Sequence, residues 1–401
     1  MTVRRAAVLA LVVSCALMSL GCSSGGAQTI TLGVSLPLTG SLAKEGALTK
    51  EGYQLCIDKI NGRGGLTVGS RTVRFDVTYV DDGGRADAAS RAVDDFNARG
   101  IKLVLGSYGS VTTAAEAAAV ERNGQVLLDS AGADDAIFSK GYRRTFAVLS
   151  PASEYASSIV KAIDELANPA PRTIAFLSAD DGFSRTGTAS GLVVARALGM
   201  QVLGTQYFPS GSTDVRKSLT RVKAVEPDVV IGSVHLAEGL AIVRQARELG
   251  ISPLAIGETV APPTEEFVRQ LGSAAEGVLG SSQWAKTVAG RDDVFGTASD
   301  YAAAVQAAYG HPADYHHAEA SAACLALALA LRDARTDEPD RVVDALAELA
   351  APSFFGPLRF DSSGKNVSKQ MVVIQIQRGV PVTVWPPGSA EAPLVWPALQ
   401  G

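Results

Sequence analysis

Short apolar runs and helical stretches alternate along most of the chain, and this alternation constrains the fold more than any other feature. The runs are rich in Val, Ile, Leu and Phe, as β-strands are, and they cover 29–36, 73–80, 101–105 and 125–128. Between them, apolar residues recur at helical spacing in 43–60, 86–98 and 112–122. Strands and helices that alternate at these lengths form βαβ units, so we predict a parallel sheet covered on both faces.

The same alternation restarts near residue 150. A helical stretch at 152–166 comes first, and strand-like runs follow at 173–177, 201–208, 228–232, 254–256 and 274–282. Further helical stretches then cover 292–309, 315–332 and 341–349, and short strand-like runs cover 358–361, 371–377 and 382–384. From Pro386 onward the chain is rich in Pro and Ala, and we expect a loosely ordered tail. Two α/β units of similar size in 401 residues predict two lobes that the chain crosses more than once.

The N-terminus reads as an export signal. Arg4 and Arg5 precede an uncharged run, 6–20, that ends at Gly21 and Cys22, and this run is too short to span a membrane comfortably. The pattern resembles a bacterial lipoprotein signal, which implies that residues 1–21 are removed, that Cys22 carries lipid such as palmitate, and that 22–28 form a tether. An ordinary cleaved signal with an incidental Cys22 is the alternative.

Charge and cysteine content exclude several classes of protein. The chain has 36 Lys and Arg against 41 Asp and Glu, without basic clusters, so we expect no nucleic-acid partner.

Of the four cysteines, Cys15 belongs to the signal and Cys22 to the lipid site. Cys56 and Cys324 remain, both on predicted helices, and in an exported protein they could pair in a disulfide or be small buried core residues.

Motifs of enzymes and metal sites are weak. The chain has no G-x-S-x-G elbow, P-loop or G-x-G-x-x-G motif, and its three S-x-x-K matches lack their partner motifs. His316 and His317 with Glu319 could suggest a metal site, but adjacent histidines point about 100° apart on a helix. We therefore expect no catalysis, no metal and no cofactor.

Several short motifs occur in the order and spacing of one known family. They are VSLPLTG (34–40), NGRGGL (61–66), YVDD (79–82), LGSYGS (105–110), SAGA (130–133), RQAR (244–247) and GPLRFD (356–361). On these motifs the chain resembles the branched-chain amino acid (Leu/Ile/Val) type of periplasmic substrate-binding protein that serves ABC importers. The resemblance implies an α/β type I periplasmic-binding fold, in which two doubly wound parallel-sheet lobes are joined by a three-crossing hinge.

The resemblance also implies where the lobes divide. The chain should cross between them near 147–149, 280–282 and 353–356. The first lobe would then contain 29–148 and 282–352, and the second would contain 149–281 and 353–401.

In open α/β sheets, ligands bind beyond the carboxyl ends of the strands, so two facing lobes create a cleft. On the first lobe, Ser110 matches the family's carboxylate-contacting serine, before a helix whose positive end suits an anion. Gly132, Ala133 and Asp134 match the positions that hold the polar end of an amino acid. Helix capping is the alternative role of Ser110 and of Asp134.

On the second lobe, Phe183 and His235 stand where tyrosine is usual in the family, and Glu258 matches the acidic partner of the ligand's ammonium group. Glu45, from the first lobe, stands where the family places an aromatic specificity residue. Phe183 could instead pack within its lobe, His235 could be an ordinary polar residue, and Glu45 could be a solvated residue at a helix start.

Together these residues predict a binding protein rather than an enzyme. Because Asp134, His235 and Glu45 make the pocket more polar than Leu, Ile or Val requires, we expect a small polar or cationic amino acid, amide or amine. We expect a monomer, anchored outside the cell by lipid, that delivers this ligand to ABC permease subunits. A sensor that acts through a partner protein remains the alternative.

Overall fold

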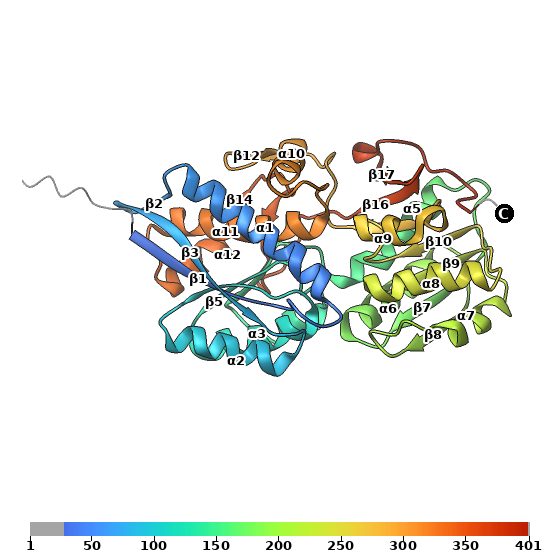
Figure 1. Ribbon diagram of the computed structural model, residues 1–401, viewed down its shortest axis with the longest axis horizontal. Coiled ribbons are helices and arrows are strands. Elements are labelled where there is room, and N and C mark those ends of the chain that lie inside the picture. Colours follow the sequence, from blue (N-terminus) through green and yellow to red (C-terminus); the bar gives the residue numbers. More distant parts are fainter. Residues whose placement is uncertain (1–27, 400–401) are drawn as a thin grey trace, which may run out of the picture.

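The computed structural model describes residues 28–399, which form two lobes lying side by side (Figure 1). The first lobe is built on a six-stranded sheet of order β2-β3-β1-β4-β5-β6. Its strands are β1 (Gln28–Leu36), β2 (Leu66–Val68), β3 (Arg71–Asp81), β4 (Leu103–Leu105), β5 (Val126–Asp129) and β6 (Thr145–Ala147). Every neighbouring pair is parallel except β2 and β3, as predicted for consecutive βαβ units.

Helices cover both faces of this sheet (Figure 1). One face carries α1 (Ala43–Gly62), α11 (Tyr315–Ala334) and α12 (Pro339–Ala347), with α10 (Ala298–Tyr309) beside α1. The other carries α2 (Ala86–Ala98) and α3 (Ser110–Asn123), which leads toward the short α4 (Asp135–Phe138). One continuous apolar core joins the sheet to these helices.

The second lobe contains a seven-stranded sheet of order β17-β16-β11-β10-β9-β7-β8. Its strands are β7 (Thr173–Ala179), β8 (Gln201–Phe208), β9 (Val229–Ser233), β10 (Ala255–Glu258), β11 (Leu279–Ser282), β16 (Val372–Gln377) and β17 (Val380–Trp385). One apolar cluster lies under α5 (Tyr155–Leu166) and α6 (Gly182–Ala197), and another lies under α7 (Arg216–Lys223), α8 (Leu236–Glu248) and α9 (Glu265–Leu271). The predicted architecture of two doubly wound parallel-sheet lobes is confirmed.

The chain passes between the lobes after β6, after β11 and before β16. The side chain of Gln283, on the second crossing, accepts from the Ser150 backbone N–H and donates to the Ser150 carbonyl oxygen, both at 2.9 Å. The Ser150 hydroxyl in turn donates to the carbonyl oxygen of Lys369 on the third crossing, at 3.2 Å. The three crossings are therefore hydrogen-bonded to one another.

The third crossing comes later in the chain than the expected 353–356. β15 (Leu358–Arg359) pairs with β14 (Ala350–Ala351), and the Asn366 amide donates to the Val148 carbonyl oxygen at 2.9 Å, so both still belong to the first lobe. The reason is apolar burial, because the side chains of this segment fill the core of the first lobe. The chain leaves that lobe only near Lys369.

Two further expectations are corrected. Residues 292–297 are not helical but form a hairpin of β12 (Arg291–Asp292) and β13 (Gly296–Thr297). The helix starts at Ala298 because Thr297 and Asp300 cap each other's backbone N–H groups.

The tail beyond Pro386 is also packed as far as residue 399: it includes the 3₁₀ turn η3 (Pro387–Ser389), and the Ala398 N–H donates to the Leu254 carbonyl oxygen at 2.8 Å.

Short elements complete the fold. They include the 3₁₀ turns η1 (Ala152–Glu154) and η2 (Gly272–Ala275), which precede α5 and follow α9. None of the helices within residues 28–399 is both long and apolar enough to cross a membrane.

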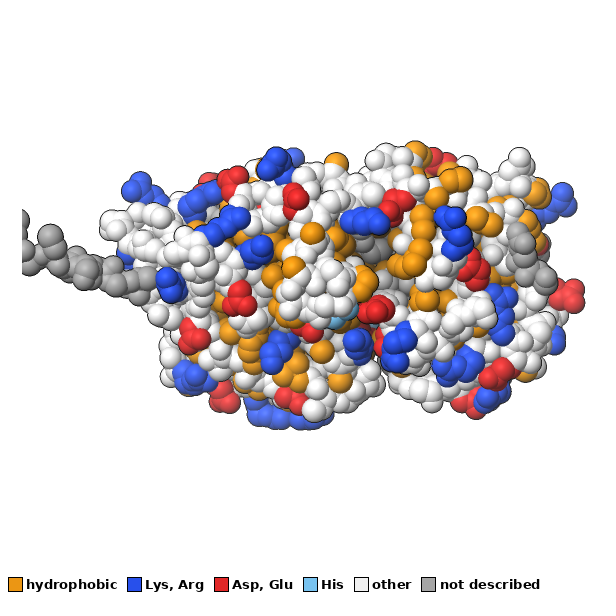
Figure 2. Space-filling model, turned by 45° about the horizontal axis from the view of Figure 1, so that its top comes forward, with side chains coloured by type: hydrophobic (Ala, Val, Ile, Leu, Met, Phe, Trp, Pro, Cys, Tyr) orange, Lys and Arg blue, Asp and Glu red, His pale blue; other side chains and the backbone are white. Residues whose placement is uncertain are grey.

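A hollow lined by hydrophobic side chains lies where the two lobes meet on the face shown in Figure 2. It occupies about 470 Å³ between α10 and β17, with Trp284, Ala302, Tyr315 and Val380 in its walls. Lys286 and Glu391 form an ion pair of 3.1 Å at this place. The hollow adjoins the hinge segment that follows β11.

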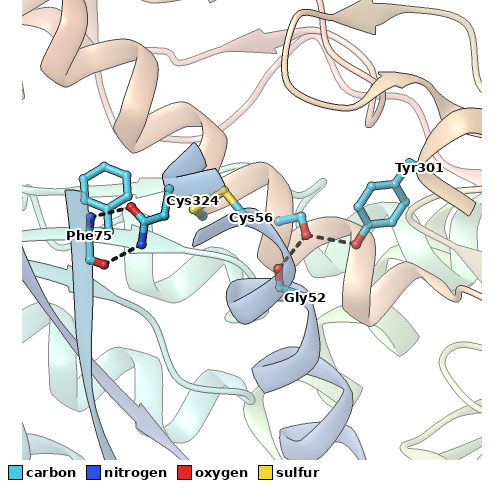
Figure 3. The surroundings of a disulfide bond; sticks show 7 residues. Gly52, Cys56, Phe75, Tyr301 and Cys324 are labelled. Carbon is cyan, nitrogen blue, oxygen red and sulfur yellow. Dashed lines mark hydrogen bonds between the residues drawn. A yellow bond between two sulfur atoms is a disulfide. The ribbon is translucent and has the colours of Figure 1, made fainter. Parts of the chain in front are cut away.

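α1 and α11 are held together by covalent and polar contacts (Figure 3). Cys56 and Cys324 form a disulfide bond, and the Ser321 hydroxyl donates to the Gly52 carbonyl oxygen at 2.6 Å. A Cβ atom at Gly52 would lie 2.3 Å from the His317 carbonyl oxygen, so only glycine allows this close approach. Of the two roles considered for Cys56 and Cys324, the disulfide is the one present in the structure.

Candidate functional site

A small cavity between the lobes lies where loops follow the parallel strands of both sheets. It occupies about 190 Å³, and its wall is made by residues that follow β1, β3 and β4 in the first lobe and β7, β8 and β9 in the second. These residues are Ser41, Leu42, Glu45, Gly84, Tyr108–Thr112, Asp181, Phe183, Ser210, Gly211, His235, Ala237 and Glu238. This is the edge at which α/β sheets bind ligands, and the volume suits a small solute.

The N-terminus of α3 faces this cavity. Gly109 occupies the cap position and provides no side-chain cap, so the N–H groups of the first turn stay open to a ligand. The Ser110 hydroxyl accepts from the Asp134 N–H at 3.0 Å, which leaves its own proton free to donate. Thr112 donates to the Tyr108 and Gly109 carbonyl oxygens and steadies the loop. These donors, at a positive helix end, suit a carboxylate.

Opposite α3, Asp181 and His235 form an ion pair of 3.6 Å in the second lobe. Burial disfavours charge on His235, but the hydrogen-bonding and charge interactions with Asp181, together with Glu238 and Glu45, outweigh it and raise the pKa to about 9. Burial likewise opposes the Asp181 charge, yet His235, the Ser184 N–H and the Ser210 hydroxyl hold the pKa of Asp181 well below its usual range. The pair is therefore charged at neutral pH.

Two further acids complete the polar wall. Glu45 is 1% exposed, and burial raises the pKa of its carboxyl although His316 and His235 act in the opposite direction. Glu238, in the first turn of α8, accepts from the Gly211 N–H at 2.5 Å. Asp181 and Glu238 place two carboxyl groups beside the one imidazolium in the wall, and the buried Glu45 carboxyl adds a polar group, so the cavity suits a ligand with positive charge and further hydrogen-bonding groups.

Aromatic rings pack beside the acids. The ring of Phe183 lies 5.2 Å from that of His235 and meets the ring of Tyr155 edge to face at 5.0 Å. The ring of Tyr108 meets that of His235 at 6.3 Å. Such rings exclude water, which strengthens the charged contacts around the cavity.

The structure brings Ser110, Glu45, Phe183 and His235 together around the cavity, as the sequence predicted, and leaves the other four predicted residues outside its wall. The Gly132 N–H donates to Asp129 at 2.7 Å, and the Ala133 carbonyl oxygen accepts from the Ala152 N–H at 2.7 Å. Because these backbone groups are already hydrogen-bonded within the protein, we no longer assign them contacts with a ligand.

Asp134 connects the two lobes instead of lining the cavity. One of its oxygens accepts from the Ala136 N–H, which caps α4, and from the Thr186 hydroxyl of α6 at 3.0 Å. The other oxygen lies so close to Gly182 of α6 that a Cβ atom there would be only 2.3 Å away. The absence of a side chain at Gly182 therefore lets Asp134 approach α6. The capping role considered for Asp134 is therefore present, with a bond to the second lobe in addition.

Glu258 lies beneath α8 and does not reach the cavity. Both of its carboxylate oxygens are buried with no hydrogen-bond partner among residues 28–399, and a Cβ at Gly239 of α8 would lie 2.5 Å from one of them. Burial, with a smaller contribution from Glu238, raises the pKa of Glu258 well above its usual value. Because Glu258 does not line the cavity, Glu238 and Asp181, which do, are the better candidates for pairing with a ligand's ammonium group.

The sequence had signals for the residues that it missed. Asp181 stands in an acidic pair with Asp180 directly after a strand, and it both caps α6 and pairs with His235. Glu238 lies three residues after His235, so the helical repeat turns it toward the same edge. The loop before Ser110 also contained Tyr108, which lines the cavity.

Two doubly wound lobes, three hydrogen-bonded crossings and a small cavity at the facing strand ends define a solute-binding protein of the two-lobed, hinged class. The family model described as "Periplasmic binding protein" matches residues 29–380, and the chain belongs to this family. Its relatives are of the branched-chain amino acid type that the motifs indicated.

One such relative is Leu/Ile/Val-binding protein homolog 8 of Brucella abortus, which is 24% identical over 382 residues, 90% of this chain and 92% of the relative. The substrate-binding protein LivJ of a branched-chain amino acid transporter from Streptococcus pneumoniae, solved with isoleucine, has a TM-score of 0.78 and 22% identity, covering 89% of this chain and all of LivJ. A solute-binding protein of an ABC transporter from R. palustris, solved with benzoate, has a TM-score of 0.76 and 16% identity, covering 92% and 97%. The same fold thus holds chemically different ligands.

Proposed function

We propose that this protein captures a small polar or cationic amino acid, or a related amide or amine, and delivers it to the permease of an ABC importer. The observation that carries the proposal is the cavity between the lobes, where the open N-terminus of α3 faces a wall of three acids. A carboxylate would bind the α3 N–H groups and the Ser110 hydroxyl, and an ammonium group would bind Asp181 and Glu238.

The chemical class of the ligand's side chain follows from the polar groups of the wall that the carboxylate and ammonium contacts leave unused. Glu45 remains in the same small space, together with Nδ1 of His235, which has no hydrogen-bond partner within residues 28–399, and a polar ligand group would serve both. An aliphatic side chain would leave them desolvated without hydrogen bonds, whereas a second amine, amide or hydroxyl would satisfy them. The relatives that bind Leu, Ile or Val by name support the amino-acid part of this proposal.

Transport rather than catalysis is supported by the family and by the hinge. Periplasmic binding proteins act outside the cytoplasm, and LivJ is by name the substrate-binding protein of a transporter. We also propose that Cys22, which lies outside the described residues, anchors the protein by lipid. Replacing it in Cys22→Ala should move the protein from the membrane fraction to the soluble fraction and remove the mass of the acyl groups.

Native mass spectrometry of freshly purified protein tests the ligand directly. We expect a retained small molecule with a polar or basic side chain, and we expect Asp181→Asn to be recovered without it because that variant loses the charged partner. Thr220→Val, which removes an exposed hydroxyl in α7, is the control and should keep the molecule. Retained leucine, isoleucine or valine would overturn the ligand class.

A further inference from the structure

Three metal-binding side chains converge in the first lobe, outside the wall of the cavity between the lobes. Glu51 comes from α1, His311 from the connection between α10 and α11, and His317 from the first turn of α11. Nε2 of His311 lies 3.0 Å and Nε2 of His317 lies 3.1 Å from Oε2 of Glu51. The donor atoms of all three residues lie within 4.8 Å of one another.

These separations are close to what a tetrahedral ion requires. Ligands at about 2.0–2.1 Å from Zn²⁺ stand about 3.3 Å apart at tetrahedral angles. The two His–Glu separations therefore need to widen by only a few tenths of an ångström. Two imidazoles and one carboxylate form a donor set that zinc uses when a fourth position is left for water.

Neighbouring groups orient these ligands. Oδ1 of Asp314 lies 3.0 Å from Nδ1 of His317, so Nε2 of that ring is the nitrogen turned toward Glu51. Asp314 is itself fixed, because it caps α11 by accepting from the His316 N–H at 2.9 Å. A carboxylate behind a metal-binding histidine is the common arrangement that fixes the ring and raises its basicity.

The other two ligands are also held in place and accessible. The Tyr309 hydroxyl donates to the backbone carbonyl oxygen of Glu51 at 2.8 Å, and the Tyr309 ring stacks on that of His311. The His317 side chain is fully buried, whereas those of His311 and Glu51 are 27% and 31% exposed. An ion can therefore enter from solvent on the side of His311 and meet a rigid ligand beneath.

The neighbouring histidine does not take part. The ring of His316 stacks on that of Tyr315 at 4.1 Å and lies 5.3 Å from that of Tyr108, in the interior of the lobe. Adjacent residues diverge by about 100° on a helix, which is why only His317 reaches Glu51. The site is thus a different set of residues from the His316, His317 and Glu319 group that the sequence analysis set aside.

We propose that Glu51, His311 and His317 bind one divalent transition-metal ion of the Zn²⁺ type. Mixed imidazole and carboxylate donors favour zinc, copper or nickel over calcium and magnesium, which prefer oxygen alone. The bound ion would connect α1 to the start of α11, the same two helices that the disulfide joins. On binding, the ion replaces any proton on the two Nε2 atoms and releases it to solvent.

The competing interpretation is a cluster of ion pairs without metal affinity. Burial lowers the pKa of His317, but the charge and hydrogen bonds of Asp314 and Glu51 outweigh it and raise the pKa to about 9. In that case a proton on His317 would satisfy both carboxylates and exclude the ion. Direct titration with metal separates the two interpretations.

The test uses the full mature chain, purified without a polyhistidine tag and stripped of metal with EDTA. Isothermal titration calorimetry with ZnCl₂ should saturate at one ion per chain, and Co²⁺ should give the visible absorption of a tetrahedral site. His311→Gln and Glu51→Gln, both at accessible positions, should each weaken Zn²⁺ binding by about tenfold or more. Glu348→Gln, an exposed acid in the same lobe, is the control and should bind as the wild type does.

A thermal readout guards against misfolded variants. In EDTA, His311→Gln and the wild type should melt at similar temperatures, and added Zn²⁺ should raise the melting temperature of the wild type only. Wild-type protein that takes up no stoichiometric Zn²⁺ would overturn the proposal. Equal Zn²⁺ affinity of the wild type, His311→Gln and Glu51→Gln would overturn it as well.

Discussion

His235 and Asp181 make the candidate site sensitive to pH. The raised pKa of His235, about 9 against an ordinary 6.5, means that its protonated form stabilises the folded protein. This contribution is fully present below about pH 6.5 and is lost as the pH rises through the folded value. A shift of this size corresponds to about 3–4 kcal/mol at most.

We therefore predict that the stability of His235→Gln depends less on pH than the stability of the wild type does. The melting temperature of the wild type should exceed that of the variant at about pH 6, and this lead should shrink by about pH 10 because the imidazolium has lost its proton. Asp181→Asn should remove the same dependence, since its carboxylate is the main partner. A difference between wild type and His235→Gln that stays constant across this range would contradict the assigned charge.

Residue by residue, the sequence located the site better than it assigned the contacts. Ser110, Phe183 and His235 follow strands directly, and the position of a loop after a strand can be read from the alternation of apolar runs. Glu258 also ends a strand, yet α8 packs over it through Gly239. That close approach depends on tertiary packing, which no local pattern contains.

At the level of elements, one hydrogen bond links α4 of the first lobe to α6 of the second. The Thr186 hydroxyl donates to Asp134 at 3.0 Å across the cleft. We predict that Thr186→Val weakens ligand binding about fivefold, since a hydrogen bond contributes about 1 kcal/mol to the arrangement in which the two lobes enclose the cavity. Calorimetric titration with the ligand identified by mass spectrometry measures this.

The matched control is again Thr220→Val, whose hydroxyl bonds only to the Arg216 carbonyl oxygen one turn earlier in α7. Affinity of Thr186→Val equal to that of the wild type would mean that the Asp134 contact does not support closure. Equal weakening by both variants would point to a general loss of stability instead.

The disulfide between α1 and α11 joins residues 268 positions apart. We predict that Cys56→Ala with Cys324→Ala lowers the free energy of unfolding by roughly 3–5 kcal/mol, because the bond closes a long loop and so restricts the unfolded chain. Chemical denaturation of the wild type and the double variant, with and without reductant, measures the loss. Two free thiols in the denatured, non-reduced wild type would contradict the bond.

Two elements show where local patterns stop being informative. The sequence predicts a helix from residue 292, but the cap formed by Thr297 and Asp300 sets the start of α10 at Ala298. The Pro/Ala-rich tail was expected to be loose, yet Ala398 and Leu399 are buried against the second lobe. The helix boundary depends on one pair of capping side chains, and the packing of the tail depends on contacts with residues distant in sequence.

For the whole molecule, the two lobes could be predicted but the hinge only in part. The alternation of strands and helices is local and repeats twice, which is enough to define two parallel sheets. The third crossing depends on whether 353–366 packs in the first or the second lobe, and the apolar core decides for the first. At the base of the cleft, the Ser150 N–H donates to the Gln283 side chain, and the Ser150 hydroxyl donates to the Lys369 carbonyl oxygen. These two hydrogen bonds join the three crossings.

We propose above that the cleft binds a polar or cationic amino acid through its acidic wall. A thermal-shift screen of the purified wild type and Asp181→Asn, against the amino acids and their amides and amines, tests it most directly. We predict that polar or basic members stabilise the wild type and that Asp181→Asn loses this response. Stabilisation of the wild type by leucine, isoleucine and valine alone, retained in Asp181→Asn, would contradict the account.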